Sequence, residues 1–134
     1  MEYKITMKYF ICALDAICIA IPGECTERVI SVSRIQSSVC ERDEQNIFIS
    51  LSLLFKKENL STPHGILLKS KNEGEKVILL TPPIDIDLEI FEKDIYTVPM
   101  ALTEKLRYFS GACFIEGRLV LILNTEKLLE AYSD

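Results

Sequence analysis

Few side chains in this sequence could perform catalytic chemistry. Histidine is the most common general base in enzymes, and the chain has one, His64. It lies in the segment Thr62-Pro63-His64-Gly65, whose proline and glycine are typical of a turn. We therefore interpret His64 as an exposed loop residue without a catalytic role.

Three carboxylates, Asp85, Asp87 and Glu89, alternate with aliphatic residues and would project from one face of a strand. Such a row could hold a hard cation. Calcium and magnesium sites, however, usually collect their oxygen ligands from a curved loop, whereas a straight strand spreads its side chains apart. We interpret the row as a solvated strand face that discourages edge pairing. A metal-dependent enzyme built on this row is a third hypothesis, after the two given below.

The five cysteines form no Cys-x-x-Cys pair and have no neighbouring histidine that could complete a zinc site. They are Cys12, Cys18, Cys25, Cys40 and Cys113. We interpret them as small buried apolar residues of a protein in the reducing cytoplasm. The sequence thus predicts no catalytic residue, no metal and no cofactor, and we expect a protein that is not an enzyme.

Composition excludes several other classes. The 134 residues are 49% hydrophobic and 26% charged, with a mean hydropathy of +0.20, so wholesale disorder is excluded. The net charge of -5 leaves no basic surface for nucleic acid. Asp15 interrupts the apolar stretch from Phe10 to Ile21, which is also shorter than the roughly 20 residues that span a bilayer. We therefore expect no direct membrane insertion.

Alternating apolar residues indicate about eight strands and a single helix. Hairpins are predicted over 9–21, 65–81 and 108–123, single strands over 29–35, 47–53 and 84–90, a polar surface loop over 36–46, and a helix over 125–132. The strand over 47–53 is expected to have a polar face with Ser50 and Ser52. Phe48 shares that face and is therefore a candidate docking residue. Many short strands joined by turns predict a β-barrel or sandwich.

Two segments carry a recognisable order of motifs. Gly111 is followed by a strand, the Glu116-Gly117 turn, an aliphatic strand ending at Asn124, and the helical Glu126-Lys127-Leu128-Leu129. This order resembles the closing hairpin and helix of the CheW-like family of chemotaxis coupling proteins. Other parts are similar to further family elements, and the resemblance extends from about Tyr9 to Leu129; these parts are Ile19-Ala20-Ile21-Pro22, Val29-Ile30 and the run from Ile84 to Pro99.

The resemblance implies that residues 1–134 form a single CheW-like domain. Such a domain is mainly β, with two small five-stranded β-barrels that share a hydrophobic core, short helices and a C-terminal helix. It further implies a non-enzymatic adaptor of chemotaxis-type signal transduction. Its partners would be the regulatory domain of the histidine kinase CheA and the cytoplasmic domain of a methyl-accepting chemoreceptor. We expect the partner-binding surface at Val29, Ile30, Phe48 and the strand that contains Gly111.

The central region departs from the family pattern. The family's Pro-Gly and Arg-Gly segments are absent between Ile35 and Leu53, and Ser52 stands where the family has aspartate. Family members use this region at the receptor groove and at the kinase contact, so we infer a diverged member with altered or lost receptor coupling. The alternative hypothesis is a repurposed β-barrel sensor whose inter-barrel groove binds a small apolar ligand.

Overall fold

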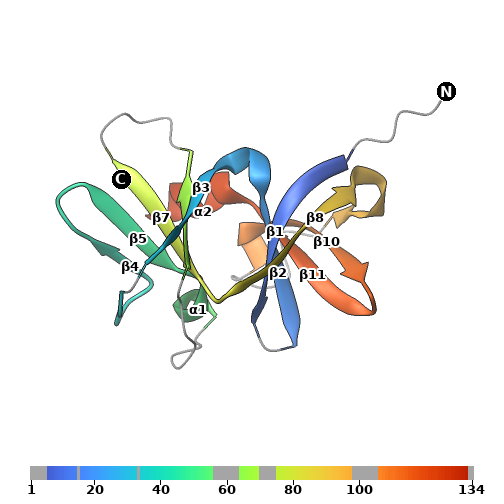
Figure 1. Cartoon of the computed structure of the whole chain (residues 1–134), viewed down its shortest axis with the longest axis horizontal. Helices are drawn as coiled ribbons and strands as arrows, with labels where there is room; N and C mark the ends of the chain where they lie inside the picture. The colour runs from blue at the N-terminus through green and yellow to red at the C-terminus, as the bar shows by residue number, and fades with distance from the viewer. Residues whose placement is uncertain are drawn as a thin grey trace.

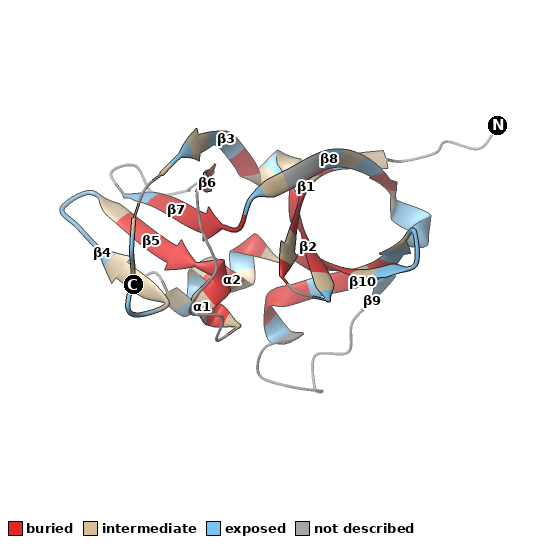
Figure 2. Ribbon diagram, turned by 60° about the horizontal axis from the view of Figure 1, so that its bottom comes forward, coloured by how far each residue is buried: buried red, intermediate tan, exposed pale blue. Residues whose placement is uncertain are grey.

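The strands of the protein form two sheets, which appear as two lobes in Figure 1. The structure is a computed structural model that describes residues 6–14, 16–32, 34–55, 64–69, 75–97 and 106–132. The first sheet has the strand order β8-β1-β2-β11-β10-β9. Its strands are β1 (Thr6–Leu14), β2 (Ile17–Pro22), β8 (Ile84–Phe91), β9 (Tyr96–Thr97), β10 (Phe109–Ile115) and β11 (Arg118–Leu123). In Figure 2 this sheet curls into a ring with buried residues along its strands.

The second sheet has the order β3-β6-β7-β5-β4. Its strands are β3 (Thr26–Ser31), β4 (Cys40–Arg42), β5 (Asn46–Ser50), β6 (His64–Leu68) and β7 (Lys76–Thr81). Two α-helices, α1 (Leu51–Leu54) and α2 (Thr125–Tyr132), and three short 3-10 turns, η1 (Gly23–Cys25), η2 (Glu92–Asp94) and η3 (Leu106–Tyr108), complete the described elements. The predicted mainly β fold with two barrel-like parts and a C-terminal helix is confirmed. The first sheet has a sixth strand because the short β9 pairs with β10.

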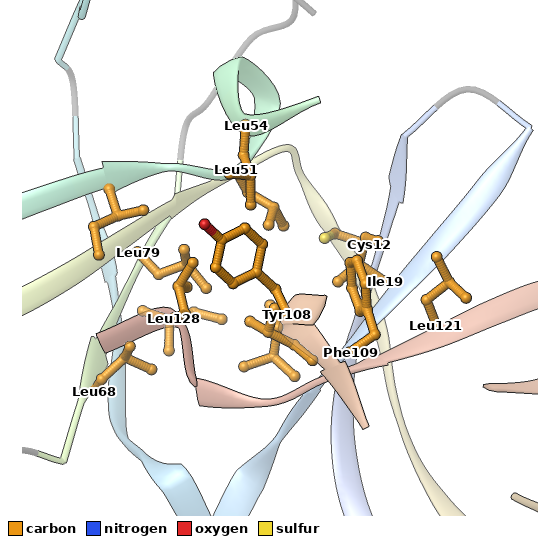
Figure 3. Packing of buried hydrophobic residues seen from close by; sticks show 14 of the residues in the cluster. Cys12, Ile19, Leu51, Leu54, Leu68, Leu79, Tyr108, Phe109, Leu121 and Leu128 are labelled. Atoms are coloured by element: carbon orange, nitrogen blue, oxygen red, sulfur yellow. The ribbon is translucent and has the colours of Figure 1, made fainter. Parts of the chain in front are cut away.

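The main hydrophobic core lies between the sheets and draws residues from both. Cys12, Ile19 and Leu121 come from the first sheet, whereas Leu68 and Leu79 come from the second (Figure 3). Helices α1 and α2 contribute Leu51, Leu54 and Leu128 to the same cluster. Because side chains of a strand alternate between two faces, the strands that build this core also supply a second, smaller cluster in each sheet.

The predicted hairpins form as the alternation indicated. Strand β1 pairs antiparallel with β2, β6 with β7, and β10 with β11. The last turn needs left-handed backbone, which Glu116 (φ 51°) and Gly117 (φ 78°) adopt. The predicted helix is α2, which begins where the Asn124 Oδ1 accepts the N–H of Lys127 at 3.1 Å. At its other end Arg42 of β4 donates to the carbonyl of Tyr132 at 2.9 Å.

The predicted strand over 47–53 is wrong beyond Ser50, and its polar face is not exposed. Strand β5 ends at Ser50, whose Oγ accepts the N–H of Leu53 at 3.2 Å and so caps α1. Ser50 is buried because residues of this sheet pack against buried clusters on both of its faces. Ser52 is also buried, as part of α1. An alternation of aliphatic and small polar residues does not distinguish this arrangement from a half-exposed strand.

Two further predictions need correction. His64 is the half-buried first residue of β6, and its Nδ1 accepts the N–H of Ile84 at 3.1 Å, so it is not an exposed loop residue. The predicted surface loop over 36–46 contains the three-residue strand β4, which pairs with β5. No sequence pattern marked β4, since it is short and its residues are Cys40-Glu41-Arg42. Within the described part of the chain, no helix is long and apolar enough to cross a membrane.

Candidate docking surfaces

The acidic row singled out for chemistry lies on strand β8, where Asp87 and Glu89 are both exposed. Asp87 lies on the edge strand β8 and is paired with Lys8 of β1 at 2.8 Å, with both side chains about half exposed. The hydrogen bond and the charge of Lys8 lower the pKa of Asp87. The side chain of Asp85 lies outside the described residues. Among the side chains that are described, no three from His, Cys, Asp or Glu converge as a metal site requires.

The two most exposed aromatic side chains of the described residues lie on neighbouring strands, at the β9 end of the first sheet. Tyr96 of β9 is 69% exposed and Phe114 of β10 is 68% exposed. Tyr96 pairs with Ala112, and Phe114 pairs with the half-buried Leu119 of β11. Since paired residues and residues two apart share a face, all four side chains lie on one face. We call Tyr96, Ala112, Phe114 and Leu119 the aromatic rim.

The aromatic rim is in contact with the hydrophobic core between the sheets. Ala112 and Leu119 are partly buried and pack against that core, whose member Leu121 is the residue paired with Ala112. Phe114 and Tyr96 extend the same apolar surface outward into solvent. A contiguous apolar surface of this kind is typical of a protein docking site.

Gly111 of β10 lies directly against β9, the strand that carries Tyr96. The residue is buried, and a Cβ added to it would lie 2.5 Å from Cγ2 of Ile95 and 2.9 Å from the carbonyl oxygen of Tyr96. Glycine at this position therefore lets β9 approach β10 closely. Gly111 was expected on the partner-binding strand, and the structure places it beneath β9, where it sets the position of Tyr96.

A second apolar surface lies at the outer strand of the second sheet. Strand β3 is the last described strand of that sheet, and among the described strands it pairs with β6 alone. Val29 is 38% exposed, whereas Ile30 is half-buried and packs against the smaller cluster of the sheet. Glu27 and Arg28 are exposed beside them. We call residues 27–30 the β3 edge.

Phe48 does not belong to either exposed surface. It is 7% exposed and packs with Leu67, Ile78 and Leu80. The guanidinium of Arg34 covers its ring, with the guanidinium carbon 4.0 Å from the ring centroid. In this structure Phe48 is therefore a core residue, and a partner would reach it only after Arg34 moved.

The segment from Arg34 to Glu41 is held by its own polar side chains. Arg34 donates to the Gln36 amide oxygen at 2.9 Å, and the Gln36 amide nitrogen donates to the carbonyl of Ser38 at 3.1 Å. Glu41 accepts the N–H groups of Ser37 and Ser38 at 2.7 and 3.0 Å. These backbone hydrogen bonds, that of Ser38 foremost, lower the pKa of Glu41. The segment that lacks the family's central motifs is thus an ordered loop.

One fully exposed aliphatic residue lies in this loop. Ile35 is 99% exposed, between Arg34 and Gln36, whose side chains are both engaged. The predicted strand over 29–35 included Ile35 in its apolar alternation, and that prediction is wrong beyond Ser31, where β3 ends. The sequence could have indicated that Phe114 is exposed, because alternation along β10 places it on the same strand face as the polar Ser110. It could not have indicated this for Tyr96, because β9 is only two residues long.

The arrangement of the two sheets is similar to that of a solved structure. The crystal structure of the scaffolding protein TtCheW from Thermoanaerobacter tengcongensis superimposes with a TM-score of 0.69, over 91% of this chain and 86% of that chain. The chain has the CheW fold. Sequence identity to TtCheW over the match is 15%. No protein-family model and no curated protein sequence matches the chain.

The CheW fold agrees with the resemblance found in the sequence motifs. The C-terminal hairpin and helix that resemble the family are β10, β11 and α2, and their order along the chain is the expected one. The departures concentrate in the loop from Arg34 to Glu41 and at α1. The CheW fold is therefore retained although the central motifs differ.

Proposed function

We propose that the protein is a non-enzymatic cytoplasmic adaptor of chemotaxis-type signal transduction. It would join the regulatory domain of the histidine kinase CheA to the cytoplasmic domain of a methyl-accepting chemoreceptor. The observation that carries this proposal is the presence of one apolar surface on each sheet of a CheW fold, the β3 edge and the aromatic rim. An adaptor needs two such surfaces in order to hold two partners. The core shared by both sheets supports a single domain over residues 1–134.

The β3 edge is the surface proposed for the kinase regulatory domain. As the outer strand of its sheet, β3 can offer main-chain groups to a strand at the barrel edge of that domain. Val29 supplies an exposed apolar side chain at this edge, and Glu27 and Arg28, which precede it, supply charges of opposite sign. Main-chain pairing gives affinity in such an arrangement, while the side chains select the partner.

The aromatic rim is the surface proposed for the receptor. Burial of one exposed phenylalanine side chain contributes roughly 1.5–3 kcal/mol, and aromatic residues often dominate the binding energy of an interface. Phe114 is paired with the half-buried Leu119, and Tyr96 is paired with Ala112, two residues before Phe114 on the same face of β10. A partner could therefore cover a continuous apolar area. The distinct loop from Arg34 to Glu41 supports receptor coupling that differs from that of other CheW-like proteins.

Isothermal titration calorimetry with each purified partner tests the proposal. Val29→Ser should weaken binding of the kinase regulatory domain by at least about tenfold and leave receptor binding unchanged, whereas Phe114→Ser should do the reverse. Ser110→Ala is the matched control, because Ser110 is an exposed polar residue on the strand that carries Phe114. The proposal is overturned if the native chain fails to bind the kinase regulatory domain or fails to bind the receptor domain.

A further inference from the structure

One side-chain hydrogen bond ties the second sheet to the first at the point where the chain crosses between them. The N–H of Ile84 donates to Nδ1 of His64 at 3.1 Å, across a sequence separation of 20 residues. His64 is the first residue of β6 in the second sheet, and Ile84 is the first residue of β8 in the first sheet. Figure 1 shows β8 continuing from β7 across to the other lobe. The bond therefore fixes the start of the crossing strand.

This bond needs a neutral imidazole. A neutral histidine ring has one nitrogen that accepts and one that donates, whereas both nitrogens donate in the charged ring. With Ile84 donating to Nδ1, the ring proton must lie on Nε2. Protonation would place a second donor opposite the N–H of Ile84 and abolish the bond. Pro82 and Pro83 carry no N–H, so Ile84 provides the first backbone donor after β7.

Among the side chains that the structure describes, those that face His64 from neighbouring strands do not ionise in the range where histidine does. His64 pairs with Ser31 of β3 and with Thr81 of β7. The next cross-strand row on the same face consists of Val29, Ile66 and Leu79. On β8, Asp87 is paired with Lys8, and Asp85 has its side chain outside the described residues. Carboxyl groups of this type titrate near about pH 4, well below the range of histidine.

We infer that His64 is a pH-sensitive latch between the two sheets. The neutral ring holds the start of β8 against β6, and the protonated ring releases it. Loss of this hydrogen bond would free the segment between β7 and β8. That segment is one of the connections between the two sheets. The inference depends on the hydrogen bond alone and is independent of the proposed adaptor function.

Nuclear magnetic resonance of the full chain tests the latch between about pH 8.5 and about pH 5.5, the range in which histidine changes charge. His64 is the single histidine of the chain, so its ring signals are unambiguous. The amide resonance of Ile84 should titrate with the same midpoint as the ring. Its protection against hydrogen exchange should fall by roughly fivefold or more on acidification, as loss of one hydrogen bond implies.

Two variants separate the latch from other effects of pH. In His64→Asn the side-chain oxygen can replace Nδ1 as acceptor but does not titrate, so the protection of Ile84 should persist and lose its pH dependence. His64→Leu lacks an acceptor and should leave Ile84 weakly protected at both pH values. The inference is overturned if the Ile84 amide of the native chain does not respond while His64 titrates. The inference is also overturned if the protection of the Ile84 amide in His64→Asn depends on pH as strongly as in the native chain. This test holds whether or not His64→Leu folds.

Discussion

The guanidinium of Arg34 lies over the ring of Phe48, with its carbon 4.0 Å from the ring centroid. Arg34 also donates to Gln36 at 2.9 Å and lies 3.6 Å from the carboxylate of Glu41. These contacts join the loop after β3 to the buried face of β5. The loop therefore acts as a cover over Phe48, and the stability of the second sheet should depend on it.

Replacement of Arg34 by alanine should lower the free energy of unfolding by about 1–2 kcal/mol, because the ring contact and the hydrogen bond to Gln36 are both lost. Urea denaturation measures this change as a lower midpoint. Arg34→Lys keeps the charge without the planar group and should recover less than half of the loss. Arg118→Ala, at an exposed arginine of β11, should change stability by less than about 0.5 kcal/mol. An unchanged midpoint for Arg34→Ala would show that the cover does not contribute.

Gly111→Ala should destabilise the protein by about 1–3 kcal/mol, the usual range for overpacking. The added Cβ would lie 2.5 Å from Ile95 and 2.9 Å from the Tyr96 carbonyl oxygen, so β9 must move away from β10. The same displacement should weaken receptor binding at the aromatic rim, even at temperatures where the variant remains folded. Thermal unfolding and calorimetric binding measure the two effects. A variant with native stability and native affinity would contradict the positioning role of Gly111.

Thr81→Val should raise the free energy of unfolding by about 1 kcal/mol, because it removes the cost of a buried hydroxyl without a partner. The Thr81 side chain is fully buried, and its Oγ1 has no hydrogen-bond partner among the residues that the structure describes. Thr26→Val is the matched contrast, since the hydroxyl of Thr26 donates to the carbonyl of Pro22 at 3.0 Å. That substitution should destabilise by about 1 kcal/mol. Equal losses of stability in both variants, measured in urea, would rule out this difference between the two hydroxyls.

The native fold should lose stability at alkaline pH through Tyr132. Burial, together with the hydrogen bond and charge of the neighbouring Tyr108, raises the pKa of Tyr132 to about 12 from its ordinary value of 10.0. The unfolded chain therefore releases this proton first, and the contribution of Tyr132 to stability falls as pH rises from about 10 to about 12. Urea midpoints measured across this range should fall less steeply in Tyr132→Phe than in the native chain. Identical slopes would mean that Tyr132 is not responsible.

Hairpins and the C-terminal helix were predictable because their signals are local. The pair β10–β11 combines two apolar runs with a Glu116-Gly117 turn, and the turn residues adopt the left-handed backbone that such a loop needs. Asn124 lies directly before the predicted helix and caps α2 by accepting the N–H of Lys127. In each case the residues that determine the element lie within it or next to it.

The docking residues were less predictable because exposure depends on distant parts of the chain. Phe48 shares a strand face with small polar residues, yet Arg34 and residues of β6 and β7 cover it. Gly111 lies on a strand expected to bind partners, yet β9 covers it. Val29 is exposed at an edge because no described strand pairs with β3 on its outer side. Periodicity identifies the two faces of a strand but not what packs on each.

Sedimentation velocity of a three-component mixture tests the adaptor function most directly. The mixture contains this chain, the CheA regulatory domain and a chemoreceptor cytoplasmic fragment from the same organism. The β3 edge and the aromatic rim lie on different sheets, so we expect both partners to bind at once and to sediment with the chain as one species. Separate sedimentation of the kinase domain and the receptor fragment, or displacement of one by the other, would contradict an adaptor with two docking surfaces.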